Sequence, residues 1–195
     1  MEKGRLEAFS DGVIAIIITI MVLEMKVPHG DSFDALKPLL PVFLSYVFSF
    51  INIGIYWNNH HHLIHASKHV NGSVLWANIH LLFWLSLFPF VTAFMGENSY
   101  TAIPVALYGF VSFMSGIAYY LLVHCLIEVN GKKSTLAIAI GKDKKGIISV
   151  VVYAIGIGLA FINPWIGIVC YVFVAGMWFI PDKRIEKKFS KESGV

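Results

Sequence analysis

The stretch Arg5–Leu23 constrains the fold more than any other part of this sequence. It carries charged side chains only near its start and then continues without a charge to its end. A run of about 20 mostly apolar residues is what an α-helix needs to cross the hydrocarbon core of a bilayer. The stretch therefore predicts a membrane-spanning helix with an unusual cluster near one end. The residues of this cluster are Arg5, Phe9, Ser10 and Asp11.

Composition extends this prediction to the whole chain. Of the 195 residues, 57% are hydrophobic and 14% are charged, whereas a soluble domain is about one quarter charged. The chain is therefore predicted to be an all-α membrane protein with six transmembrane helices per chain. Residues 1–181 are expected to form one channel-sized unit, followed by a basic cytoplasmic tail of residues 182–195. The expected helices cover residues 5–25, 39–65, 73–95 (kinked at Pro89), 102–128, 146–162 and 165–180, and the longest expected loop is 130–145.

The basic residues predict how the chain is oriented in the membrane. With six spans, every Lys and Arg except Lys26 and Lys37 falls on one side. Basic residues concentrate on the cytoplasmic side of membrane proteins, so both termini are expected to be cytoplasmic. An odd number of spans would separate the basic tail from the basic loop of residues 130–145, which favours an even number.

The first helix has an aliphatic stripe along one side. At about 100° per residue, Ile16, Ile20 and Leu23 lie within a narrow sector, and Thr19 flanks them. The Ser10–Asp11 pair lies well away from this sector. Core packing is the simpler interpretation of such a stripe, whereas in a symmetric oligomer the same side chains would line a central axis.

Asp11 needs a separate explanation, because an ionisable group within a membrane helix is costly and usually faces protein. Arg5 is six residues away and does not share its side of the helix. The topology brings other polar groups to the same depth. These groups are Trp57, Asn58, His61, His65, Asn78 and His80. We expect a buried polar network that fixes helix packing, with direct proton transfer or ion binding as the alternative.

The histidines near the end of the second helix raise the question of a metal site. His61 and His65 are four residues apart and would make a bidentate pair. A zinc site needs three or four ligands, and a catalytic one also needs a general base. The sequence has no HExxH motif and no acidic residue near this run. We therefore predict no metal site and no catalytic residues. No cofactor and no nucleic-acid partner are expected either.

The pattern Arg5-x-x-x-Phe9-Ser10-Asp11 resembles the signature of the transmembrane protein 175 family, the lysosomal potassium channels and their prokaryotic relatives. The likeness continues through Trp57–His61 and through Asn78–Phe90, and it covers the chain as one six-helix unit.

The resemblance implies a homotetramer in a prokaryotic plasma membrane, with potassium ions as the permeant species. In this family the first helices line the pore, and bulky aliphatic rings form its constriction. Counted from the FSD residues, the rings fall on Ile16, Ile20 and Leu23, with the hydroxyl of Thr19 beside them. Ala15 stands where some members carry a serine. If that hydroxyl supports selectivity, its absence weakens the expected preference for potassium.

The resemblance also implies that the arginine and the FSD side chains hold helices together. Their implied partners are Trp57, His61, Asn78 and His80. Three other functions stay open on the sequence: a proton-coupled carrier that uses Asp11 and the histidines, a metal-dependent membrane enzyme built on residues 60–65, and a scaffold protein without ion flux.

Overall fold

The computed structural model describes residues 3–131, 133–141 and 144–179, and every regular element among them is helical. The elements are α1 (Lys3–Leu23), α2 (Phe33–Leu36), the 3-10 helix η1 (Lys37–Leu39), α3 (Leu40–His65), α4 (Gly72–Ser86), α5 (Phe88–Glu97), α6 (Ala102–Asn130), α7 (Thr135–Ile140), α8 (Lys144–Ala160) and α9 (Pro164–Phe179). The expectation of an all-helical chain is confirmed. The predicted tail of residues 182–195, and the domain boundary before it, lie outside the described residues.

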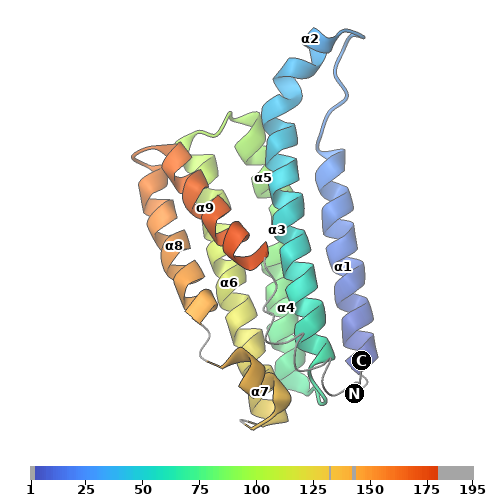
Figure 1. The fold of residues 1–195 in the computed structure, drawn as a ribbon. Coiled ribbons are helices and arrows are strands. Elements are labelled where there is room, and N and C mark those ends of the chain that lie inside the picture. The colour runs from blue at the N-terminus through green and yellow to red at the C-terminus, as the bar shows by residue number, and fades with distance from the viewer. Residues whose placement is uncertain (1–2, 132, 142–143, 180–195) are drawn as a thin grey trace.

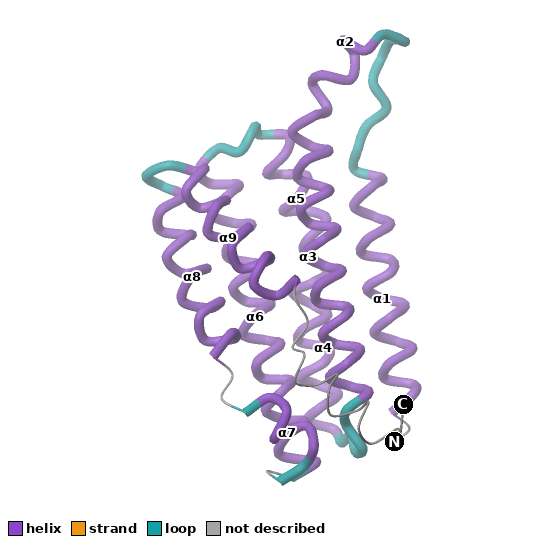
Figure 2. The backbone as a smooth tube through the Cα atoms, viewed as in Figure 1, coloured by secondary structure: helices purple, strands orange, loops and turns teal. Residues whose placement is uncertain are grey.

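The long helices form one bundle, and the loops gather at its two ends (Figures 1 and 2). α6 is central and packs against α4, α5, α8 and α9. α1 lies at one edge of the bundle, where it contacts α3, α4 and α5, and α8 lies at the opposite edge (Figure 1). One side of α1 is therefore packed, and its other side has no neighbour within the described chain.

Four helical segments are long and apolar enough to cross a membrane. They are Lys3–Leu23, Phe33–His65, Gly72–Glu97 and Ala102–Asn130. Two further apolar helices, Lys145–Ala160 and Pro164–Phe179, are shorter. At 1.5 Å per residue, the 16 residues of α9 measure about 24 Å, against a hydrocarbon core of about 30 Å. These lengths are those of an integral membrane protein whose last two helices are near the lower limit for spanning.

Pro89 divides the third expected helix. α4 ends at Ser86, and α5 begins at Phe88 with Pro89 in its first turn. Proline has no N–H to donate, and its ring clashes with the preceding turn, so the helical hydrogen-bond ladder is interrupted. The expected kink is present as a one-residue break at Leu87, and the two helices still form one long apolar segment.

Two segments that were expected to be loops contain helices. Residues 33–39 form α2 and η1, so the helical segment that leads into α3 begins earlier than predicted. Within residues 130–145, α7 is capped by the hydroxyl of Ser134, which accepts from the N–H of Ala137 at 3.2 Å. Both predictions were wrong. Ser134 caps α7, whereas Ser32 before α2 makes no side-chain cap hydrogen bond. Serine and aspartate are typical of loops, but they also cap and begin helices.

Candidate pore helix and its polar anchor

α1 has a buried face that points into the bundle. Its buried side chains are Leu6, Ser10, Ile14, Ile17 and Met21. They recur every three to four residues, which is the spacing that places side chains on one side of an α-helix. This face packs against α3, α4 and α5. The aliphatic stripe lies on another side of the helix.

The stripe is exposed on the surface of the protomer. Ile16 is 57% exposed, Ile20 is 41% exposed and Leu23 is 78% exposed. Thr19 lies among them, and its hydroxyl donates to the backbone carbonyls of Ala15 at 3.1 Å and of Ile16 at 2.9 Å. Core packing within one protomer therefore does not account for the stripe.

An open groove of about 600 Å³ runs beside the stripe, between α1 and the α4–α5 segment. Its lining includes Ile16, Ile20, Glu24, Pro89, Phe90 and Glu97. Glu97 also pairs with Lys26, whose Nζ lies 3.1 Å from its Oε1. The groove thus joins an aliphatic wall to a pair of carboxylates at the end of α1 and α5.

A buried chain of hydrogen bonds joins α1 to α4 and α3. Asn78 Nδ2 donates to Ser10 Oγ at 2.9 Å, and His60 Nε2 lies 2.7 Å from Asn78 Oδ1. Ser10 Oγ donates in turn to the carbonyl of Leu6 at 2.9 Å. In this arrangement the Asn78 oxygen accepts from His60, which places the imidazole proton on Nε2. The three side chains are at most 1% exposed, so the chain connects three helices away from water.

A second set of contacts joins the same end of α1 to α3. Trp57 Nε1 donates to Asp11 Oδ1 at 3.0 Å, and His61 Nδ1 lies 3.1 Å from Glu7 Oε1. The rings of Trp57 and His61 stack with 6.0 Å between their centroids. Since residues four apart share one side of a helix, the two pairs form a ladder between α1 and α3. Together with the Ser10 chain, the ladder fixes the rotation of α1 about its axis.

Three residues predicted for this cluster lie elsewhere. His80 Nε2 accepts from Trp84 Nε1 of the same helix at 3.0 Å, because a residue two positions from Asn78 points to nearly the opposite side of α4. Arg5 and Phe9 are exposed. Within the described chain, no hydrogen bond or ion pair involves the Arg5 side chain. At about 100° per residue, both lie on the side of α1 that carries the stripe.

Sequence reasoning missed His60 and Glu7. His60 lies eight residues after Asn52 and three before Leu63, both on the buried side of α3, so helical periodicity would have separated it from its neighbours. Glu7 lies four residues before Asp11 and shares its side of α1. In both cases the helical spacing would have identified the residue, because it places His60 on the buried side of α3 and Glu7 on the same side of α1 as Asp11.

The histidine run does not converge on one point. His60 faces α4, whereas the rings of His61 and His65 stack along α3 with 6.0 Å between centroids. In the described part of the chain, no three side chains of His, Cys, Asp or Glu are placed to hold one metal ion.

Known proteins share both the sequence and the fold of this chain. The family model described as endosomal/lysosomal potassium channel TMEM175 matches residues 5–89. A protein named as a potassium channel from Chryseobacterium sp. (strain P1-3) is 56% identical over 191 residues, which cover 98% of this chain and 100% of that protein. The chain belongs to the TMEM175 family. The resemblance inferred from the RxxxFSD pattern is confirmed.

Two further relatives of this TMEM175-family protein are informative. A crystal structure of a lysosomal potassium-selective channel TMEM175 homolog from Chamaesiphon minutus matches with a TM-score of 0.81 and 27% identity, covering 93% of this chain and 98% of that chain. The endosomal/lysosomal proton channel TMEM175 of Gallus gallus is 40% identical over 75 residues, which are 32% of this chain and 15% of that protein. By these names, the family consists of channels and not of enzymes.

Proposed function

We propose that this TMEM175-family protein is a potassium-permeable cation channel. Four copies assemble around an axis, each with six helices across the membrane of a prokaryotic cell and both termini in the cytoplasm. The α1 helices line the pore, and rings of Ile16, Ile20 and Leu23 form its constriction. Thr19 lies beside these rings, and Glu24 lies at the outer mouth.

The exposure of the stripe on α1 carries this proposal. The helix buries Ile14, Ile17 and Met21 in its own bundle and leaves the stripe without a partner. Lipid would also accept aliphatic side chains. The contacts of Ser10 and Asp11 fix the rotation of α1 about its axis. A pore requires this fixed rotation, because each copy must point the same side chains at the axis.

An aliphatic constriction works as a gate through its hydration. A narrow apolar pore blocks ions by losing its water, and isoleucine and leucine offer no oxygen to replace the water around K⁺. Ions therefore pass only when the rings widen or become wet. Thr19 donates its hydroxyl proton to a backbone carbonyl, so its oxygen lone pairs are free to face a passing cation. Selectivity then depends on the radius of the pore and on the hydration that it tolerates.

The polar residues at the cytoplasmic end of α1 act in this proposal as an anchor and not as an ion site. The anchor comprises Arg5, Phe9, Ser10, Asp11, Trp57, His61 and Asn78, whereas His80 bonds to Trp84 within α4. Asp11 and Ser10 contact α3 and α4 of their own protomer. Arg5 and Phe9 lie on the exposed side of α1 and contact a neighbouring copy in the tetramer.

Ion flux from reconstituted liposomes tests the proposal. Purified protein is placed in vesicles loaded with K⁺ or Na⁺, and flux is measured against protein-free vesicles. We expect K⁺ flux above that of Na⁺, with single-channel currents too large for a carrier. Protein that is tetrameric and folded but carries no flux of any cation would contradict a channel and favour a scaffold.

Proton permeation through the same pore is a second candidate function. It is favoured by the name of the Gallus gallus relative, an endosomal/lysosomal proton channel. A pH-sensitive dye inside the same vesicles measures it. Proton flux that persists at single-channel rates supports permeation, whereas a slow flux that vanishes in Asp11→Asn supports the carrier mechanism.

A further inference from the structure

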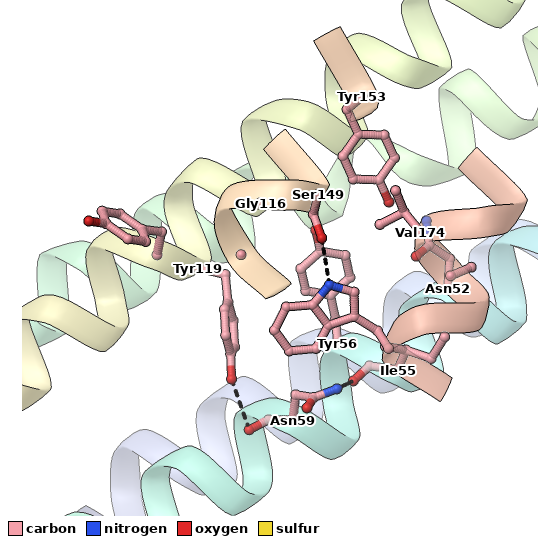
Figure 3. Close-up of a pocket in the computed structure, with 13 residues that line it drawn as sticks. Asn52, Ile55, Tyr56, Asn59, Gly116, Tyr119, Ser149, Tyr153 and Val174 are labelled. Carbon is pink, nitrogen blue, oxygen red and sulfur yellow. Dashed lines mark hydrogen bonds between the residues drawn. The ribbon is translucent and has the colours of Figure 1, made fainter. Parts of the chain in front are cut away.

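A small pocket lies inside the protomer between α3, α6, α8 and α9 (Figure 3). Its volume is about 40 Å³. Asn52 and Tyr56 of α3 line it, together with Gly116 of α6 and Ser149 and Tyr153 of α8. All of its lining residues come from these four helices, so the pocket is separate from the candidate pore helix and from the groove beside it.

The pocket carries several polar groups although it lies among membrane-spanning helices. Asn52 and Tyr153 are each 3% exposed and lie at its wall. The hydroxyl of Tyr56 also lies at the wall, 4.0 Å from where a Cβ at position 116 would be. Among the described residues, this hydroxyl has no hydrogen-bond partner. An unsatisfied polar group within the hydrocarbon region costs several kcal/mol, so a partner inside the pocket is expected.

The size of the pocket selects its occupant. A cavity needs about 10–15 Å³ to hold one water molecule, whereas a cavity of about 150 Å³ is needed for benzene. A volume of about 40 Å³ therefore admits a few water molecules and excludes an aromatic ring or a lipid chain. Apolar cavities stay dry, but a polar wall that offers two to four hydrogen-bonding groups retains water.

We propose that this pocket is a binding site for a cluster of about two or three water molecules, a count set by its volume. The waters bond to the hydroxyls of Tyr56 and Tyr153 and to the side chain of Asn52. Each water supplies a hydrogen bond that the protein does not supply to itself. The site exists in every protomer and does not depend on the function proposed above.

The water cluster forms the inner end of a polar chain that crosses the bundle. The side chain of Asn52 interacts electrostatically with the hydroxyls of both Tyr153 and Tyr108. Ser49 Oγ lies 3.1 Å from the Tyr108 hydroxyl and 2.6 Å from Thr92 Oγ1. Beyond it, Thr92 Oγ1 lies 4.0 Å from the sulfur of Met21, which is on the buried face of α1. The waters are thus connected through four helices to the back of the helix that carries the stripe.

Hydroxyl-radical footprinting tests the proposal on the full-length protein in detergent. Radicals generated from water by an X-ray pulse oxidise the side chains that water touches. We expect Tyr56 to be oxidised about tenfold faster than Tyr108, which is 0% exposed, accepts from Ser49 and is not part of the pocket wall, since buried water stays only at polar sites. Equal, slow oxidation of both tyrosines would overturn the proposal.

Filling the pocket gives a matched pair of variants. Gly116→Val places methyl groups where the nearest atoms are 3.9 Å from Cβ, so it fits and displaces water. Gly158→Val makes the same change where no atom lies within 4 Å of Cβ, outside the pocket. In Gly116→Val alone, the oxidation rate of Tyr56 should fall to about that of Tyr108, because the displaced water is the radical source. No fall in Gly116→Val, or the same fall in both variants, contradicts a water site.

The stability of Tyr56→Phe gives an independent measurement. If the hydroxyl is buried without a partner, its removal raises the melting temperature, because an unsatisfied polar group is lost. If water satisfies it, removal leaves the melting temperature unchanged or lowers it. Tyr46→Phe is the control, since Tyr46 is on the same helix outside the pocket and packs against Phe50. A higher melting temperature for Tyr56→Phe than for Tyr46→Phe would show that the pocket is dry.

Discussion

Two kinds of polar residue hold α1, and they differ in their exposure to water. Ser10, Asn78 and His60 are fully buried and are joined in a single direction, from the imidazole through the amide to the hydroxyl, while His60 Nδ1 has no partner among the described residues. Asp11 bonds to Trp57, whose side chain is 44% exposed. Asn78 and Ser10 each donate and accept within this chain, which makes it specific. The half-exposed pair contributes less to stability and more to the orientation of α1.

Asp11→Ala should weaken assembly before it changes permeation. The change removes the acceptor for Trp57 Nε1 and costs about 1–2 kcal/mol, as expected for a hydrogen bond to a partly solvated charge. We expect a smaller tetramer fraction in size-exclusion chromatography. Asp34→Ala is the control, because Asp34 is exposed and pairs only with Lys37. A stable Asp11→Ala tetramer with altered ion selectivity would show instead that Asp11 acts on the ions.

Ile16→Asn should raise ion leak and reduce the preference for K⁺ over Na⁺. An amide at the constriction keeps water in the pore, so the barrier from dewetting falls. Liposome flux of both ions measures the effect. Ile155→Asn is the matched control, since Ile155 is 52% exposed on α8, at the opposite edge of the bundle (Figure 1). Unchanged flux in Ile16→Asn would remove Ile16 from the constriction.

At the scale of elements, α8 and α9 pack closely because their contact surfaces carry glycine. A Cβ at Gly167 would lie 2.9 Å from the carbonyl oxygen of Gly156, and a Cβ at Gly156 would lie 2.7 Å from the ring of Tyr171. Tyr171 also passes so close to Gly109 of α6 that no side chain fits there. Small residues let membrane helices approach each other closely. This contact holds the two shortest apolar helices against the rest of the bundle.

Gly156→Ala should destabilise the protein, whereas Gly158→Ala should not. The first change inserts a methyl group into a filled space and costs about 1–3 kcal/mol. The second faces open space and gains up to about 1 kcal/mol of helix propensity. Thermal unfolding in detergent, followed by tryptophan fluorescence, compares the two variants. Equal melting temperatures would mean that α8 and α9 are not in tight contact.

At the scale of the whole molecule, the exposed side of α1 carries side chains that a single copy leaves uncovered. The stripe, Arg5 and Phe9 share this side, and the groove beside it ends at Glu24 and Glu97. An arginine within reach of the membrane is costly unless it is paired or at the interface. Assembly of several copies around the α1 helices would cover the side chains that a single copy leaves open.

Native mass spectrometry should therefore find a tetramer, and Leu23→Cys should cross-link between subunits. Leu23 is 78% exposed at the end of α1, so copies around a common axis bring this position together. A short bifunctional maleimide links such cysteines in protein that lacks Cys125 and Cys170. Ile155→Cys, at the outer edge of the bundle, should not link. Efficient linking at Ile155 with none at Leu23 would place α1 on the outside.

Much of this architecture was predictable from residue spacing. The apolar runs predicted the long helices, Pro89 predicted the break between α4 and α5, and the RxxxFSD pattern predicted the family. The stripe of Ile16, Ile20 and Leu23 followed from helical periodicity alone. These features are local. A helix forms its backbone hydrogen bonds within itself, and its sequence determines which side chains lie on the same side.

Only the tertiary structure decided which polar groups meet. His60, and not His61, reaches Asn78, because one position along α3 turns a side chain by about 100°. His61 instead pairs with Glu7, and His80 bonds within its own helix. Such partners depend on the rotation of each helix against its neighbours, which is set by packing along the entire contact. The sequence by itself therefore determined the helices and their faces, and the packed bundle determined which face each one meets.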